Sequence, residues 1–358
     1  MSYFLAFLGF VVLVVLHEAG HFAAAKAVGM RVERFSLFFP PHVFKKRRGE
    51  TEYAIGVIPA GGYVKITGMN PDEQLPDEVR TRAYYAQPPW KRIVVIAAGP
   101  LVNFVLAALL LLAFFVVHGP EQPTRQIEGV AKRLPAHGVL KPGDEIVAVD
   151  GHAGGPRRIH DLIAAHRCPR QPPVSGCKAA RPATLLVERA GRRSTVTLTP
   201  QYDRATKSMR VGFVYRFEHH GEPLGRAADT TATTFWFFAK ATVALPLRVF
   251  DSKRRKEIGS AVGGYEVTRQ TIEKDAGEAL GIIALISLSL AIINLYPFLP
   301  LDGGHIFWAV LEKIRRRPVA FSTMERASVI GFALVLGFFF IGLSNDIGRL
   351  TGEGFGVR

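Results

Sequence analysis

Residues 3–25 read YFLAFLGFVVLVVLHEAGHFAAA, an apolar stretch interrupted by His17, Glu18 and His21. A helix needs roughly 20 mainly apolar residues to cross the hydrocarbon core of a membrane, so this stretch is long enough to span one. No Lys or Arg precedes it and no small-residue cleavage site follows it, which argues against a secretory signal peptide. We therefore expect a retained membrane helix that carries polar groups.

Three further stretches share this length and texture: residues 93–117, 279–300 and 326–344. The chain is 48% apolar and 21% charged, which is close to a globular average. The two classes of residue are segregated, however, into apolar blocks of bilayer length and polar blocks between them. This alternation excludes a simple soluble globule and a disordered chain, and it predicts a multi-pass α-helical membrane protein with four core transmembrane helices.

Basic residues near the ends of the spans set the expected orientation. Lys26 and the run Lys45–Arg48 follow the first span, Lys91 and Arg92 abut the second, and Arg315–Arg317 follow the third. Because short cytoplasmic loops carry the excess of Lys and Arg, both termini are expected outside, in a bacterial cell (inner) membrane. The net charge of +15 then marks topology and contact with membrane lipid rather than nucleic-acid binding, for which no motif is present.

The polar blocks complete the expected organisation. Residues 229–250 are aromatic but carry Lys240, Pro246 and Arg248, which favours an interfacial helix over a span. In chain order we expect the first transmembrane helix at 1–26, a cytoplasmic loop at 27–92, the second transmembrane helix at 93–118, an extracytoplasmic domain at 119–228, the interfacial helix and linker at 229–278, the third transmembrane helix at 279–302, a cytoplasmic loop at 303–325, the fourth transmembrane helix at 326–345 and a C-terminal tail at 346–358.

The first cytoplasmic loop contains Glu52–Thr67, whose apolar and polar residues alternate around the turn Pro59-Ala60-Gly61-Gly62. This pattern predicts a membrane-associated β-hairpin. An exposed strand edge beside a membrane site could pair with an unfolded peptide by strand addition. A hairpin that only plugs the underside of the protein is the alternative.

The extracytoplasmic block reads as a small α+β domain. Ile127–Ala131, Ala183–Arg189 and Ser194–Pro200 are strand candidates, and Arg158–His166 suits a short helix. The string KPGDEIVAVDG that ends at Gly151 resembles a PDZ domain of the bacterial protease type. That resemblance implies binding of a peptide or substrate segment; a rigid spacer is the alternative.

Cys168 and Cys177 lie in a Pro-rich loop of this block. Outside the cell membrane a local disulfide is plausible, and free thiols or a metal clip with His166 are the alternatives.

The interruption of the first span has the pattern HExxH, as His17-Glu18-Ala19-Gly20-His21. Residues i and i+4 share one face of a helix, so both imidazoles can bind one Zn²⁺ ion, with Glu18 as general base. Ionisable groups at membrane depth are unfavourable by several kcal/mol and by default indicate function. A metal site is therefore expected inside the first span.

A zinc protease needs a third protein ligand and an open position for water. Asp302 is the candidate, because the topology places the end of the third span at the depth of the two histidines. Pro297 and Pro300 break that helix and leave irregular backbone beside the site. Such backbone is tolerated at membrane depth only inside protein or next to water, which hydrolysis requires.

These motifs together resemble the site-2 protease family, the RseP-like intramembrane zinc metalloproteases, here with one PDZ domain. The resemblance rests on HExxH in the first helix, on Gly99, Pro100 and Asn103 in the second, and on the string from Asn294 to Gly304 in the third. It covers nearly the whole chain in order.

The resemblance implies zinc held by His17, His21 and Asp302, with Asn294 supporting the substrate or the oxyanion. It also implies cleavage of single-span membrane proteins, of the anti-sigma-factor or signal-peptide-remnant type, in regulated intramembrane proteolysis. Two departures stand out: Pro300 lies one residue later than the second proline of the family, and residues 262–265 replace a Gly-Pro-x-Gly segment.

Other functions remain open at this point. A metal-binding transporter would place polar residues along a path across the bilayer, whereas here they cluster at one depth. A PDZ scaffold has no need of Glu18 beside the histidines. A catalytically dead relative is the third alternative, because of the shifted Pro300.

Overall fold

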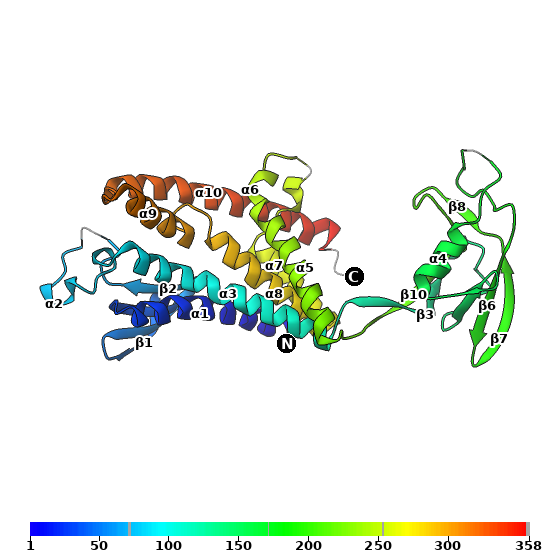
Figure 1. The fold of residues 1–358 in the computed structure, drawn as a ribbon, viewed down its shortest axis with the longest axis horizontal. Coiled ribbons are helices and arrows are strands. Elements are labelled where there is room, and N and C mark those ends of the chain that lie inside the picture. Colours follow the sequence, from blue (N-terminus) through cyan, green and yellow to red (C-terminus); the bar gives the residue numbers. More distant parts are fainter. Residues whose placement is uncertain (71–72, 171, 253, 356–358) are drawn as a thin grey trace. The chain divides into compact units, whose positions relative to one another are not determined.

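Long apolar helices dominate one of the two units into which the chain divides. The computed structural model describes residues 1–70, 73–170, 172–252 and 254–355. The helical unit comprises Met1–His118 and Glu222–Arg358, and the second, β-rich unit comprises Gly119–Gly221 (Figure 1). The β-rich unit is thus inserted in the sequence of the helical one.

Four helices of the described chain are long and apolar enough to cross a membrane: α1 (Ser2–Ala27), α3 (Pro89–Val117), α8 (Ala276–Asn294) and α10 (Phe321–Gly348). They match the four predicted spans. Leu, Val and Phe side chains cover much of their outer surface. A surface of this kind is stable against lipid tails but not against water.

Further helices join these spans. They are α2 (Asp77–Arg80), α5 (Leu224–Val243), α6 (Leu245–Arg248), α7 (Ala261–Lys274) and α9 (Asp302–Arg315). The third predicted span, at 279–302, is two elements in the structure. Helix α8 ends at Asn294, the segment 295–301 is irregular, and α9 begins at Asp302, because Pro297 and Pro300 cannot continue a helix.

The sheet of the helical unit differs from the predicted hairpin. Strand β1 (Val32–Arg48) pairs with β2 (Thr51–Ile66), and residues 34–37 pair with 62–65 on one side and with 52–55 on the other. The two halves of the predicted hairpin therefore flank residues 34–37 instead of pairing with each other, so that prediction was wrong in its pairing. The pairing involves a non-local contact: Phe22 of α1 packs edge-on against both Phe35 and Tyr53, which are neighbours in the sheet.

The tight turn between β1 and β2 is fixed to the end of α1. Glu50 accepts hydrogen bonds from both Arg82 Nη atoms, at 2.8 Å, and from Lys26 Nζ at 2.5 Å. Arg82 and then Lys26 lower the pKa of Glu50 to about 2. The Glu50 carboxylate therefore stays ionised throughout the neutral pH range, and the turn stays anchored to the end of α1.

Helix α5 also differs from its prediction. We expected a helix from residue 229 that lies in the membrane interface, but α5 begins at Leu224 and packs along α3 and α8 (Figure 1). Phe235 lies against Phe104 of α3, and the Tyr296 hydroxyl donates to the Thr242 carbonyl at 2.6 Å. Phe235 and Phe238 thus face the helical bundle, whereas Trp236 and Phe237 are exposed, so a place for α5 in the membrane interface stays a prediction.

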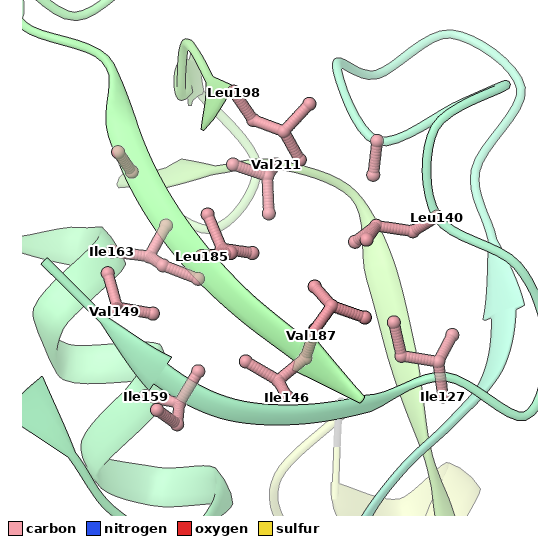
Figure 2. Packing of buried hydrophobic residues seen from close by; sticks show 12 residues of the cluster. Ile127, Leu140, Ile146, Val149, Ile159, Ile163, Leu185, Val187, Leu198 and Val211 are labelled. Atoms are coloured by element: carbon pink, nitrogen blue, oxygen red, sulfur yellow. The ribbon is translucent and has the colours of Figure 1, made fainter. Parts of the chain in front are cut away.

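The β-rich unit contains a sheet with the strand order β10-β3-β4-β6-β7. Its strands are β3 (Glu121–Val130), β4 (Glu145–Val149), β5 (His152–Ala153), β6 (Ala183–Arg189), β7 (Arg192–Leu198), β8 (Gln201–Asp203), β9 (Ser208–Arg210) and β10 (Phe213–His219), with one helix, α4 (Pro156–Ala164). Figure 2 shows the core of this unit, where Ile146, Leu185 and Val187 of the sheet face Ile159 and Ile163 of α4. Strands β6 and β7 and helix α4 lie within two residues of the predicted elements, whereas β3 begins six residues before the predicted Ile127, and the unit ends at Gly221 instead of residue 228.

Two local features complete this unit. Asp144, in the predicted KPGD turn, is almost fully buried and accepts hydrogen bonds from Arg189 at 2.6 and 2.7 Å, which lower its pKa. Cys168 and Cys177 form a disulfide with a Cα–Cα distance of 5.9 Å. Both cysteines belong to one Pro-rich loop that carries no strand of the sheet, so this bond links two parts of the same loop.

Helix α7 is tied to the end of α10 through Asp346. That carboxylate is fully buried and accepts hydrogen bonds from Ser260 N, Ser260 Oγ and Gly263 N at 2.7–3.0 Å. Arg349 lies 3.1 Å from its other oxygen. A Cβ atom at Gly263 would lie 2.4 Å from Asp346 Oδ1, so only glycine fits there.

The Gly263→Ala variant is therefore expected to lower the free energy of unfolding by about 1–3 kcal/mol, because the buried carboxylate loses hydrogen bonds. Thermal unfolding of the full chain in detergent measures this. Gly264→Ala is the matched control, since a Cβ atom there meets nothing nearer than 3.8 Å. Equal stability of the two variants would contradict the anchoring role of Gly263.

Candidate active site

The HExxH residues lie in the second half of α1. His17 and His21 are both buried and point to the same side of the helix, as their spacing of four residues predicts. His21 Nδ1 lies 2.9 Å from the carbonyl oxygen of Val95 in α3. A carbonyl oxygen only accepts, so Nδ1 carries the proton and Nε2 keeps a lone pair, which is the form of histidine that binds a metal ion.

Asp302 meets these histidines from the first residue of α9. Its Oδ2 atom lies 3.2 Å from His17 Nε2 and 3.3 Å from His21 Nε2, and the two Nε2 atoms are 3.3 Å apart. The structure thus brings together three residues of which one is separated from the others by most of the chain. Their three ligand atoms form a nearly equilateral triangle.

This triangle has the size that a zinc ion requires. Zinc in proteins is tetrahedral with bonds of about 2.0–2.2 Å to nitrogen and oxygen, which separates neighbouring ligand atoms by about 3.3–3.5 Å. Two imidazoles and a carboxylate are also ligands that zinc prefers. Asp302 Oδ2 is buried without a hydrogen-bond partner among the described residues, as expected of an oxygen whose partner is a cation. The residues present therefore fit a zinc ion.

Helices α1 and α3 approach closely at this site because glycine occupies both sides of the contact. A Cβ atom at Gly20 would lie 2.6 Å from the Ala98 carbonyl oxygen. A Cβ atom at Gly99 would lie 2.2 Å from His21 Nε2. Any side chain at residue 99 would therefore occupy the position of a ligand atom.

Glycine also positions the segment that carries Asp302. A Cβ atom at Gly303 would lie 2.2 Å from the Leu295 carbonyl oxygen, and one at Gly304 would lie 2.5 Å from Leu299 N. Gly331 of α10 lies against the Leu299 carbonyl in the same way. The irregular segment 295–301 is thus packed between α9 and α10, which explains why two glycines follow Asp302.

The body of α9 is fixed to the start of α3 by a buried ion pair. Arg92 and Glu312 are both almost inaccessible to solvent and hydrogen-bonded to each other. Arg92 also lies over the ring of Tyr85 at 5.3 Å, and Glu312 accepts a hydrogen bond from Val319 N. Since Asp302 is the first residue of α9, this pair helps to hold the third ligand in place.

Glu18 lies between the triangle and the sheet. It interacts electrostatically with His17, His21 and Asp302. A Cβ atom at Gly62 would lie 3.0 Å from Glu18 Cγ, so the Gly61-Gly62 pair lets β2 come this close. Residues 62–66 pair with β1 on one side only among the described pairings, so the other edge of this segment is available.

Asn294 is the remaining residue of the predicted site. It ends α8 and is half-buried, but no described contact joins it to the triangle, so its role stays a prediction. The sequence reasoning gave no role to Gly62, Val95 or the Arg92–Glu312 pair. Gly99 was quoted only as part of a motif; its position directly after the pair Ala97-Ala98, in a run of small residues inside a span, was the available signal for a close helix contact.

Comparisons with known proteins agree with this geometry. The profile described as Peptidase family M50 matches residues 5–338. Three similar relatives each carry the name "Putative zinc metalloprotease". One from Nostoc sp. is 30% identical over 98% of this chain and 97% of its own length, and one from Mesorhizobium japonicum is 30% identical over 94% and 95%. One from Brucella suis is 28% identical over 94% and 92%.

Among solved structures, the PDZ domain of the SdrC-like protein from Listeria innocua is similar to 28% of this chain over its full length, with 16% identity and a TM-score of 0.21. The corresponding PDZ domain from Listeria monocytogenes covers 26% of this chain, also with 16% identity and a TM-score of 0.21.

Proposed function

Since the chain belongs to Peptidase family M50, the site-2 protease family, we propose that it cleaves single-span transmembrane proteins within the bilayer. It is a zinc metalloprotease and a multi-pass membrane protein. The observation that carries the proposal is the position of the triangle of His17, His21 and Asp302. Two of its ligands lie on an apolar, membrane-length helix, and ionisable groups are unfavourable there unless they serve a function.

The proposed location is the bacterial inner membrane, with both termini on the extracytoplasmic side. The basic residues at the cytoplasmic ends of the spans support this orientation. It places the catalytic site near the cytoplasmic face and the β-rich unit outside. A substrate would then be cut close to its cytoplasmic end.

In the proposed mechanism His17, His21 and Asp302 hold the zinc ion. A zinc ion held by these residues would supply Lewis-acid chemistry, which makes a water molecule a stronger acid and a carbonyl group more electrophilic. Glu18 accepts the proton of the attacking water and then donates it to the leaving amide nitrogen. Asn294 donates a hydrogen bond to the oxygen of the scissile carbonyl as negative charge develops on it.

A transmembrane substrate has to unwind before this chemistry, because each carbonyl in its helix accepts an intrahelical hydrogen bond. The unpaired edge of residues 62–66 supports a way of holding the unwound segment. That edge lies beside Glu18, and its backbone N–H and C=O groups can pair with an extended peptide by strand addition. The scissile bond would then lie between β2 and the metal ligands.

The β-rich unit is proposed to act as a PDZ domain that selects substrate segments. A cavity between α4 and β10 supports this role. Phe213, Tyr215 and Phe217 alternate along β10 and line it, facing Arg157 and His160 of α4. An apolar floor with a basic rim suits an extended peptide that carries negative charge.

We propose that the substrates are anti-sigma factors or remnants of signal peptides, which would place the enzyme in regulated intramembrane proteolysis. Both are single-span segments left in the membrane. The PDZ cavity then tests whether the outer part of a substrate has been trimmed.

The test is reconstitution of the purified full chain in liposomes with a model single-span substrate. We expect cleavage near the cytoplasmic end, complete loss of cleavage after treatment with a zinc chelator, and recovery on addition of Zn²⁺. Cleavage that survives removal of all metal would overturn the zinc mechanism. Zinc binding without any cleavage would instead favour a transporter, a scaffold or a catalytically dead relative.

A further inference from the structure

Asn103 of α3 is an unexplained polar residue inside the helical bundle. Its side chain is fully buried, and neither the carbonyl oxygen nor the amide nitrogen has a hydrogen-bond partner among the described residues. Leaving both ends of an amide unpaired in a protein interior is unfavourable by several kcal/mol. A leucine of similar size would avoid this loss, so the presence of Asn103 requires a partner.

The packing of α1 on α3 shows where that partner lies. His21 meets Val95 and Gly99, and Gly20 meets Ala98 and Val102, so later residues of α1 contact earlier residues of α3 and the two helices are antiparallel. One turn back along α1 from His21 is His17. One turn forward along α3 from Gly99 is Asn103, so this register places Asn103 opposite His17.

A second contact places Asn103 where three helices meet. The Ser287 hydroxyl of α8 donates to the backbone carbonyl of Asn103 at 3.0 Å. Four residues of an α-helix rotate by about 40° more than one full turn. Side chains four residues apart along α3 therefore point in gradually changing directions, from α1 at Gly99 toward α8 at Ala107. Asn103 lies between these two faces.

His17 has the hydrogen-bonding group that the Asn103 side chain lacks. Its Nε2 atom belongs to the ligand triangle, while its Nδ1 atom is buried with no partner among the described residues. A histidine that binds metal through Nε2 carries a proton on Nδ1, and such protons are almost always donated to an oxygen. His21 has this oxygen in Val95, one turn away along the same helix pair.

We propose that the side-chain oxygen of Asn103 accepts the Nδ1 proton of His17 and thereby orients this imidazole toward the metal ion. Asn103 is a positioning residue that acts through His17. Rotation of its side chain forms the bond, since no described hydrogen bond holds the amide in another direction. The proposal rests on His17 being a zinc ligand, as proposed above.

The test is zinc affinity, measured by competition with a chelating dye on the purified full chain. Loss of an outer partner of a metal ligand weakens metal binding 10- to 100-fold. We expect this weakening for Asn103→Leu, and affinity close to that of the unaltered chain for Asn103→Asp, which keeps an acceptor oxygen. Binding of Co²⁺ gives a second readout, because its visible absorption changes when the His17 ring is misoriented.

Ser287→Ala is the matched control, because it removes a contact of Asn103 without touching the proposed acceptor. Its zinc affinity should be unchanged. Unfolding of the metal-free variants separates positioning from packing: Asn103→Leu should be at least as stable as the unaltered chain and still bind zinc more weakly. If it does not fold, Asn103→Ala replaces it in the comparison with Asn103→Asp.

Equal zinc affinity of Asn103→Leu (or its Ala replacement), Asn103→Asp and the unaltered chain would overturn the inference. His17→Ala tells whether the ligand set itself fails. Undiminished zinc binding by His17→Ala would contradict the proposed zinc site, whereas weak binding by His17→Ala with normal binding by Asn103→Leu would contradict only the role of Asn103.

Discussion

The Glu18→Gln variant is expected to bind zinc as tightly as the unaltered chain and to cleave its substrate about 10²- to 10⁴-fold more slowly. Glutamine has the shape of glutamate but cannot accept the proton of the attacking water. The glycine at residue 62 leaves the same room for either side chain. Metal analysis and single-turnover cleavage of a reconstituted single-span substrate measure the two quantities separately.

Glu78→Gln is the matched control, since Glu78 is exposed on α2. It should retain both zinc and activity. Cleavage at the unaltered rate by Glu18→Gln would exclude Glu18 as the base. The same variant holds its substrate uncut, so cross-linking it in membranes would identify the natural substrate.

The Gly99→Ala variant is expected to bind zinc more than 100-fold more weakly than the unaltered chain. Loss of the hydrogen-bond partner of a metal ligand alone weakens metal binding by about 10- to 100-fold. The new methyl group would lie 2.2 Å from the Nε2 atom of His21, which has to move out of the ligand triangle. Helices α1 and α3 cannot move apart to make room for this methyl group without breaking the hydrogen bond between His21 Nδ1 and the Val95 carbonyl oxygen. Zinc content, zinc affinity and cleavage should all fall together.

Gly337→Ala makes the same change in α10, where a Cβ atom meets no described atom within 4 Å. It should leave zinc affinity and cleavage unchanged. Unfolding of the metal-free proteins then shows whether Gly99→Ala acts on the site or on the fold. Full zinc affinity in Gly99→Ala would mean that α1 and α3 lie farther apart than the structure has them.

The metal site was predictable because each of its parts obeys a local rule. The spacing of His17 and His21 places them on one face of any helix, and charge at the ends of the spans gives the depth of Asp302. The four spans were predictable for the same reason, since length and apolar texture suffice. Relations that involve one segment and its own surroundings can be read from a sequence.

The pairing of the sheet could not be read in this way. Alternating residues on both sides of the Pro59–Gly62 turn suggest a hairpin, and nothing in that pattern reveals that residues 34–37 lie between its two halves. Phe35 and Tyr53, which pair with each other, both contact Phe22 of α1, and these are tertiary contacts. The start of α5 at Leu224 and its contact with Phe104 could not be read from the sequence for a related reason, because an aromatic residue packs on lipid headgroups or on another ring equally well.

The separation of Asp302 from the two histidines has a consequence for biosynthesis. A ribosome has to complete nearly 300 residues after His17 before the third ligand emerges, and α9 has to dock on α3 through Arg92 and Glu312 before it reaches the others. A nascent or truncated chain therefore lacks a high-affinity metal site. The ligand cluster therefore forms only after helices α1, α3 and α8 have all been synthesised.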